Sequence, residues 1–134
     1  MREILFRGKR MDDGEWVEGY LVKAVGGECM ILPVTTEHCG GAEFSEGYHC
    51  DPTTVGQYTG LKDKNGKRIF EGDIAKVLQG KDKDIAYVGF ENGAFMLYPK
   101  TGNIYERTLW EYWYNDWDVE VIGNVTDNHE LLEK

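Results

Sequence analysis

The sequence predicts a mostly β fold: a small antiparallel barrel-like or sandwich domain of about eight short strands with a short C-terminal helix. Two observations favour it. The chain has 17 glycines and 3 prolines, which indicates many turns. Stretches that alternate apolar and polar residues recur between turn signals roughly 8–12 residues apart. With 134 residues the chain can bury its own core. We expect one domain over 1–134, or two lobes, 1–57 and 58–134.

The first half is expected to hold three strands. Residues 2–7 fit a first strand, and 15–23 alternate cleanly after a turn at Met11–Gly14. A third, more buried strand runs from Cys29 and ends at or just after Pro33. Residues 35–52 have no clear period, so we expect a long loop or an irregular edge segment there. Such loops in compact domains are often functional.

The second half is expected to consist of hairpins and a final helix. Asn65-Gly66 and Asn92-Gly93 are tight-turn signals, because both residue types accept a positive φ at little cost. Further predicted strands cover 74–78, 85–91, 94–98 and 119–125. Asp127 and Glu130, three residues apart, resemble a capping pair before a short helix over 128–133.

Charge and cysteine content indicate the cellular compartment and exclude some classes of ligand. The formal net charge is −9, and a negative surface field repels phosphate backbones, so we expect no nucleic-acid ligand. Three cysteines cannot all pair within one chain, and no CxxC is present. With no recognisable signal peptide, this favours free thiols in the cytosol. No apolar run is long enough to cross a bilayer. We therefore expect a cytoplasmic protein that is not bound to a membrane.

Three segments carry a family resemblance. The opening Met1–Gly8, the central block Val55–Ile74 and the closing Val119–Val125 with Glu130-Leu131-Leu132 together resemble the YopX family of phage and prophage proteins. The chain has Thr126-Asp127-Asn128-His129 where that family usually has Glu-Asn-Pro before the last helix. The resemblance runs from end to end of the chain. It implies a mostly β fold and an origin in a mobile element, and it brings no established activity, cofactor or catalytic residue.

The central block also has a physical interpretation of its own. Gly60, Gly66 and Gly72 are expected at backbone turns, and the carboxylates of Asp63 and Asp73 are suited to accept hydrogen bonds from local amides. We therefore interpret this block as a folding signature rather than a binding or catalytic motif.

Residues that could carry chemistry are few. His38-Cys39 and His49-Cys50 suggest a zinc site, but adjacent residues of an extended segment point to opposite faces, so no metal and no other cofactor is expected. The only serine, Ser45, is not in a nucleophile elbow. Glu71 and Asp73 could act as paired carboxylates, but their turn position favours capping. We expect no catalytic residue, and the pattern argues against an enzyme without excluding one.

The aromatic segment 104–118 is the most unusual feature. Trp110, Trp113 and Trp117 follow helical spacing, although Trp110, Tyr112 and Tyr114 also alternate; we favour a short helix or turn. These three tryptophans are the candidate binding residues. Core packing or a lobe interface is the commoner role of such a cluster, and a protein-binding hot spot is the alternative. The acids around them disfavour stacking on single-stranded nucleic acid: Glu106, Glu111, Asp116 and Asp118.

Three functional hypotheses follow. The first is a phage or prophage accessory protein that acts as a protein-interaction module, binding a host or phage protein. The second is an acidic nucleic-acid mimic that blocks a host DNA-binding enzyme, using the acids at 12, 13, 15, 18, 116, 118 and 120. The third is a small enzyme that uses the 35–52 loop. Self-association into a homo-oligomer is a further expectation, because short strands leave edges that can pair between subunits.

Overall fold

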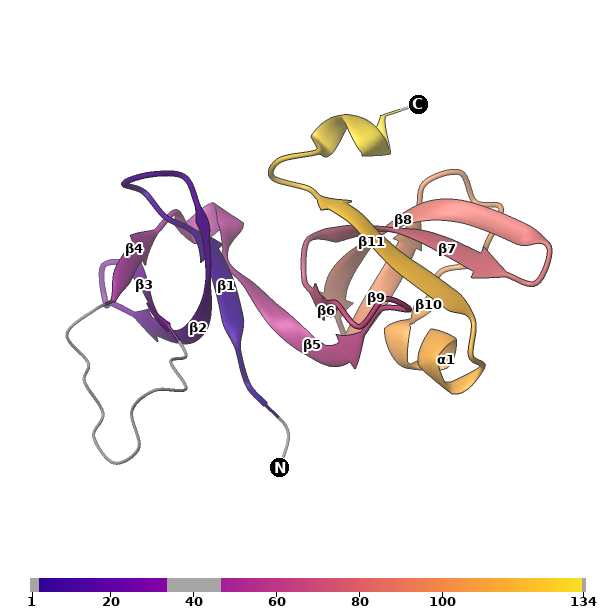
Figure 1. Ribbon diagram of the computed structural model, residues 1–134, viewed down its shortest axis with the longest axis horizontal. Helices are drawn as coiled ribbons and strands as arrows, with labels where there is room; N and C mark the ends of the chain where they lie inside the picture. The colour runs from indigo at the N-terminus through magenta and orange to yellow at the C-terminus, as the bar shows by residue number, and fades with distance from the viewer. Residues whose placement is uncertain (1–2, 34–46, 134) are drawn as a thin grey trace. The chain divides into compact units, whose positions relative to one another are not determined.

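The computed structural model describes residues 3–33 and 47–133. The chain divides into two compact units, Met1–Tyr58 and Thr59–Lys134. The described residues form eleven strands in two open sheets, and every pairing between them that is resolved is antiparallel (Figure 1). The predicted mostly β, antiparallel fold is confirmed. No helix within the described residues is both long enough and apolar enough to span a bilayer.

The first unit is built on a sheet in which neighbours along the chain lie side by side. Its strands are β1 (Phe6–Lys9), β2 (Trp16–Lys23), β3 (Cys29–Pro33) and β4 (Tyr48–Cys50), in the order β4-β3-β2-β1. A 3-10 helix, η1 (Pro52–Thr54), follows β4, and β5 (Gly56–Lys62) then pairs with β1 through Gln57 and Gly56. An isolated bridge from Arg10 to Cys50 joins the end of β1 to β4.

The interior of the first unit is small and tightly packed. Ile31, Cys29 and Cys50 are buried from β3 and β4, with Leu5 preceding β1. Gly8 of β1 faces the same interior, because a Cβ added there would lie 2.9 Å from the Cys50 Cβ. A strand glycine of this kind permits a close approach that no larger residue allows.

The second unit contains a five-stranded sheet in the order β10-β9-β8-β7-β11. β5 continues from the first unit into this one, where it neighbours β6. The elements of the second unit that follow β5 are β6 (Arg68–Phe70), β7 (Asp73–Gln79), β8 (Asp82–Glu91), β9 (Ala94–Pro99), β10 (Arg107–Thr108), α1 (Leu109–Tyr114), β11 (Asp118–Asn124) and η2 (His129–Leu132).

The core of the second unit combines the inner face of the sheet with α1 and β6. Alternate residues of β7 and β8 point inward, as in Ala75 and Val77, and Ile69 of β6 joins them. Leu109 and Tyr112 of α1 complete the same cluster. The helix is therefore held to the sheet by its buried side chains, which fixes the direction of the others.

The predicted turns are confirmed where they were marked by glycine. Gly66 has φ +81°, and Asn92 and Gly93 have φ values of 52° and 82°, as a tight hairpin turn requires. Asp63 and Asp73 accept backbone N–H bonds nearby, from Asn65 and Phe70 respectively, as predicted. These bonds hold the central block in its folded shape.

Some local predictions need correction. The first strand, expected over 2–7, is β1 at Phe6–Lys9. Within 35–52, where a long loop or an irregular edge segment was expected, residues 48–50 form the strand β4 at the edge of the sheet, which agrees with the second alternative. Residues 34–46 lie outside the described residues. The predicted capping pair also fails, because the last helix is the 3-10 helix η2 and its N-cap is Asn128, whose side chain makes no capping bond to the helix. The Asn128 amide oxygen accepts from the Asn124 N–H instead, and Asp127 contacts Asn124.

Candidate functional site

The predicted aromatic segment folds into the short helix α1, and its start is fixed by a capping box. The Thr108 hydroxyl accepts a hydrogen bond from the Glu111 N–H at 3.2 Å, and the Glu111 carboxylate accepts one from the Thr108 N–H at 3.4 Å. Arg107 donates to the same carboxylate at 3.0 Å. A helix of six residues has little stability of its own, so this cap and the buried side chains hold it in place.

The helix buries one face and exposes aromatic rings on the other. Leu109 and Tyr112 are buried in the core. Trp110, Trp113 and Tyr114 are 55%, 60% and 67% exposed, and together we name them the aromatic face. The rings of Trp110 and Tyr114 stack with centroids 5.0 Å apart. Large aromatic side chains exposed together on a rigid element are typical of a binding surface.

Trp117 does not belong to this face. The helix ends at Tyr114 with Asn115 as its C-cap, and Asp116 adopts a left-handed φ of 55°, so the chain turns away from the helical path. The Trp117 ring lies half-buried against Tyr112, with centroids 5.3 Å apart, and the Arg107 guanidinium lies 5.5 Å from its centre. Of the three predicted binding residues, the structure places Trp110 and Trp113 on one exposed helix. Trp117 packs half-buried against the core and, together with Trp113, lines a pocket.

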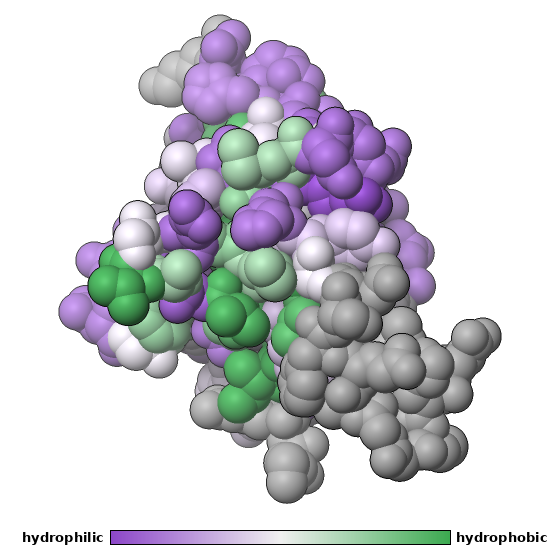
Figure 2. Space-filling view, turned by 90° about the vertical axis from the view of Figure 1, so that its left-hand side faces the viewer, coloured by the Kyte–Doolittle hydropathy of each residue, from purple (hydrophilic) through white to green (hydrophobic). Residues whose placement is uncertain are grey.

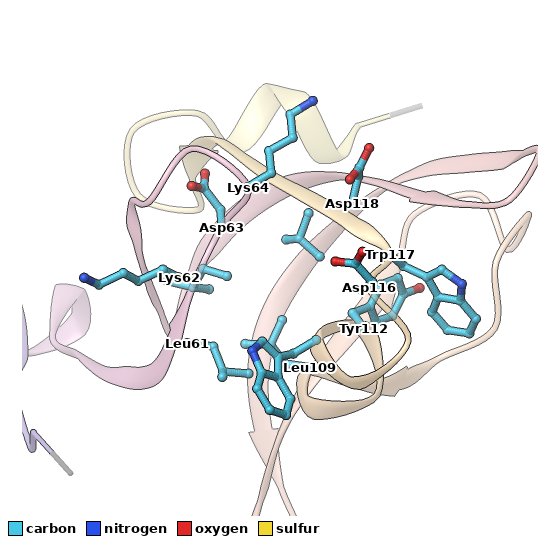
Figure 3. Close-up of a pocket in the computed structure, with 12 residues that line it drawn as sticks. Leu61, Lys62, Asp63, Lys64, Leu109, Tyr112, Asp116, Trp117 and Asp118 are labelled. Atoms are coloured by element: carbon cyan, nitrogen blue, oxygen red, sulfur yellow. The ribbon is translucent and has the colours of Figure 1, made fainter. Parts of the chain in front are cut away.

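A pocket of about 170 Å³ opens beside Trp113 (Figure 3). Its apolar wall consists of buried or half-buried side chains: Leu61, Ile69, Leu109, Tyr112 and Val119. Lys62 and Lys64 line one side, where their side chains point outward, and Asp116 and Asp118 line the other. A cavity on the order of 150 Å³ holds a benzene ring. The pocket therefore has room for one aromatic or branched aliphatic side chain.

The sequence did not predict the hairpin wall of this pocket. Residues 61–64 are far from α1 along the chain, and the buried Asp63 carboxylate joins their hairpin to β11, the strand that follows α1. Asp63 accepts hydrogen bonds from Asn65 and Lys67 within the hairpin and from Val121 of β11, each at 2.9 Å. The Lys64 N–H also donates to the Val119 carbonyl at 3.0 Å. The sequence marked Asp63 only as an aspartate in a turn next to a glycine. That position did not indicate that Asp63 would accept a hydrogen bond from the distant Val121.

Exposed charges of both signs surround the aromatic face and its pocket, with Lys62 and Lys64 on one side and Asp116 and Asp118 on the other. Arg107 forms an ion pair with Glu111, and this hydrogen bond lowers the pKa of the Glu111 carboxyl. The remaining acids, Glu106, Asp116 and Asp118, are exposed. Burial raises the pKa of the Tyr112 hydroxyl to about 12, so that ring stays neutral beneath the face. A cationic group of a ligand is therefore favoured on the side of the pocket where Asp116 and Asp118 lie.

The other chemistry-bearing candidates do not form a site among the described residues. His49 is exposed while its neighbour Cys50 is buried, so the two side chains lie on opposite faces of β4. No group of three histidine, cysteine or carboxylate residues in the described ranges could hold a metal ion. His38, Cys39 and Ser45 lie outside those ranges. Asp73 caps the turn before β7 by accepting from Phe70 at 2.7 Å.

Removing the cap of α1 is expected to destabilise the aromatic face. Thr108→Ala deletes the hydroxyl that accepts from the Glu111 N–H, which should lower the free energy of unfolding by about 1 kcal/mol. Thr108→Ser keeps the hydroxyl and is the matched control. Urea denaturation followed by tryptophan fluorescence measures both variants. Equal midpoints for the alanine and serine variants would show that the cap contributes nothing.

A second group of apolar side chains is exposed on the first unit. Tyr20 and Val22 of β2 and Val25 of the following turn belong to it. In Figure 2, which views the protein from one side, apolar residues are interrupted by hydrophilic ones. No aromatic ring on a helix stands beside a pocket in this group, among the residues that the structure describes. The aromatic face of α1 is therefore the stronger candidate for a binding surface.

Comparison with known proteins identifies the family. The sequence model of the family described as YopX protein matches residues 5–133. The chain is similar in structure to protein EF1440 from Enterococcus faecalis, known from a crystal structure, with a TM-score of 0.61 and 24% sequence identity. The alignment covers 99% of this chain and 100% of that chain, and at this identity it shows the fold alone. No curated protein matches the chain.

Proposed function

The chain belongs to the YopX family, and from that premise and the geometry of α1 we propose that it is a phage or prophage accessory protein that acts in the cytoplasm as a protein-interaction module. The docking surface is the aromatic face together with the pocket beside Trp113. The observation that carries the proposal is the position of Trp113. Its ring is more than half exposed, yet it forms part of the wall of a pocket with an apolar floor.

Such an arrangement fits the anatomy of a protein-binding hot spot. Hot spots are enriched in tryptophan and tyrosine, and they combine an exposed anchor with a pocket that the partner fills. The capping box and the buried Leu109 and Tyr112 hold α1 in one orientation. The helix therefore loses little conformational entropy when a partner binds.

The chemistry of the pocket and of the charges beside it defines the partner. The pocket volume of about 170 Å³ fits a single apolar side chain. The acids Glu106, Asp116 and Asp118 are complementary to lysine or arginine. The partner is therefore a protein that presents one aromatic or branched aliphatic residue with a basic residue on the side that faces Asp116 and Asp118.

Selection of peptides from a random display library tests this proposal directly. Peptides enriched on the immobilised chain are expected to carry one apolar anchor next to lysine or arginine. Trp113→Ala should weaken their binding by at least about 30-fold, because truncating a hot-spot tryptophan commonly costs 2 kcal/mol or more. Tyr105→Ala is the matched control, since Tyr105 is an exposed aromatic residue that does not line the pocket.

Two results of this selection would contradict the proposed docking surface. A library that yields no enriched peptide, or peptides that bind the Trp113→Ala and Tyr105→Ala variants alike, would contradict the proposal. Thermal melting of each variant shows that the fold is kept, which is expected because both side chains are largely exposed. Affinity capture from host lysate with the same pair of variants then identifies the natural partner.

The two alternative functions have less support. A nucleic-acid mimic would need Asp12 and Asp13 to imitate the unpaired charges of phosphates, but both are ion-paired with Arg10, at 2.6 and 3.2 Å. The enzyme hypothesis depends on the 35–52 loop, and most of that loop lies outside the described residues. Neither alternative has a described group of residues comparable to the pocket beside Trp113.

A further inference from the structure

We propose that Cys29 and Cys50 form a redox-sensitive dithiol, a modification site at which a low-molecular-weight disulfide oxidises the pair to an intrachain disulfide. The two residues lie directly opposite each other in the antiparallel pairing of β3 and β4. Both are free thiols in the structure. The site lies in the first unit and does not depend on the proposed docking surface of α1.

The register of the two strands brings these side chains to the same face. Alternate residues of β3 and β4 are buried, and Cys29 and Cys50 are on the buried side, whereas the next pair, Met30 and His49, points the other way. Directly opposed residues of antiparallel strands have Cα atoms about 4.5–5.5 Å apart. A disulfide needs Cα atoms about 4.4–6.8 Å apart, so the pair can close with little backbone movement.

A pocket gives small molecules access to the pair. It has a volume of about 520 Å³, and both cysteines line it together with Gly26, Gly27 and Pro52. The Cys29 residue is 5% exposed and Cys50 is 1% exposed. Burial, followed by the nearby Cys29, raises the pKa of the Cys50 thiol. Cys29 is thus the better placed of the two to meet an oxidant first.

The reaction is a thiol–disulfide exchange in two steps. The Cys29 thiolate attacks one sulfur of the small disulfide, whose S–S bond breaks, and the first small thiol leaves. The Cys50 thiolate then attacks the Cys29 sulfur, the protein disulfide forms, and the second small thiol leaves. The two protein thiols lose two protons and two electrons, which reduce the small disulfide to two thiols.

The bond would join the edge strand β4 covalently to β3. β4 has only three residues, all of them paired with β3, so this pairing is short. A crosslink between these two strands constrains the unfolded chain and should raise the melting temperature of the first unit. The redox state of the pair would in this way set the stability of that edge.

The test uses the full chain carrying Cys39→Ser, which removes the third thiol, and oxidised glutathione as the probe. We expect both remaining thiols to disappear with a loss of about 2 Da and no lasting adduct. Digestion without reductant should link the peptides that contain Cys29 and Cys50. The melting temperature should rise and should return to its starting value with dithiothreitol.

Two further variants test the order of attack. Adding Cys50→Ser should leave a stable glutathione adduct on Cys29, because no second thiol can displace it. Adding Cys29→Ser should leave Cys50 reacting at least about tenfold more slowly, since a buried thiol with a raised pKa is a poor nucleophile. Hydrogen exchange of β2 and β7 checks that each variant is folded. If a serine variant does not fold, the Cys39→Ser chain alone decides the outcome.

Two results would overturn the proposal, and a third would overturn its assigned order of attack. The first is that both thiols of the folded Cys39→Ser chain persist while the same chain in urea is oxidised. The second is a crosslink between two chains in place of one within a chain. The third is equal reactivity of Cys29 and Cys50 in the two single-thiol variants, which would remove the assigned order of attack.

Discussion

Gly19→Ala is expected to prevent the first unit from folding. Gly19 lies in the middle of β2, where it pairs with Phe6 of β1 and Pro33 of β3. A Cβ at this position would lie 1.9 Å from the Leu32 carbonyl oxygen and 2.9 Å from the Pro33 Cα. These are backbone atoms of the neighbouring strand, so no side-chain rotation relieves the overlap. The cost should exceed the roughly 1–3 kcal/mol typical of an overpacked core.

Gly26→Ala is the matched control. No atom lies within 4 Å of a Cβ built at Gly26, and its backbone is outside the left-handed region, so its stability should change by less than about 1 kcal/mol. Hydrogen exchange monitored by mass spectrometry resolves the two units. We expect β2 and β3 to lose protection in the Gly19→Ala chain while β7 and β8 keep theirs. Protected β2 amides in that chain would show that the strand can adjust.

Asp63→Asn is expected to detach the β5–β6 hairpin from β11. One oxygen of Asp63 accepts from the hairpin amides of Asn65 and Lys67, and the other accepts from Val121. An asparagine can keep one of these oxygens, but its NH₂ group would face an N–H donor and leave it unsatisfied. A lost hydrogen bond to a buried charged group costs about 1.5–3 kcal/mol. Asp82→Asn, at an exposed carboxylate on β8 that does not line the pocket, is the control.

Urea denaturation gives the free energies, and the proposed docking surface gives a second readout. Because the hairpin supplies Leu61 and Lys62 to the pocket, Asp63→Asn should also weaken peptides selected on the aromatic face. A stable Asp63→Asn chain with full peptide binding would show that Asp63 holds neither the hairpin nor the pocket wall.

The Asp63 carboxylate should also make the free energy of unfolding depend on pH. Burial by itself would raise the pKa of the Asp63 carboxyl, but hydrogen bonds from Val121, Lys67 and Asn65 outweigh it and lower the pKa from the ordinary value of 3.8. The folded state therefore binds this proton less readily than the unfolded state does. The stabilisation is complete above about pH 4 and is lost as the pH falls through the lowered pKa. The loss of stability below pH 4 should be smaller for Asp63→Asn than for the unmodified chain.

Elements with strong local signals were predicted well from the sequence. Alternation gave β2 at Trp16–Lys23, and the Asn92-Gly93 turn gave the β8–β9 hairpin, because turn geometry and the pleat of a strand depend on neighbouring residues. β4 was expected only as a loop or an irregular edge segment, because three residues carry too little pattern. The cap before η2 was wrong because Asn128, not Asp127, occupies the N-cap position.

The candidate site was predicted only in part for a similar reason. The spacing of Trp110 and Trp113 indicated a helix, and α1 carries both. Trp117 has the spacing of the same stripe, but a left-handed Asp116 ends the helical path before it. The pocket wall at Leu61 and Lys62 could not be predicted, because the contact joins segments far apart in the chain.

The sequence by itself determined the family, the antiparallel β class and the positions of the tight turns, since each depends on local composition, period or motif. Only the tertiary structure decided which aromatic rings are exposed, that Asp63 reaches Val121, and that Cys29 faces Cys50. The physical reason is that exposure and long-range pairing follow from how distant segments share one core. That property belongs to the packed chain and cannot be assigned to any single stretch of it.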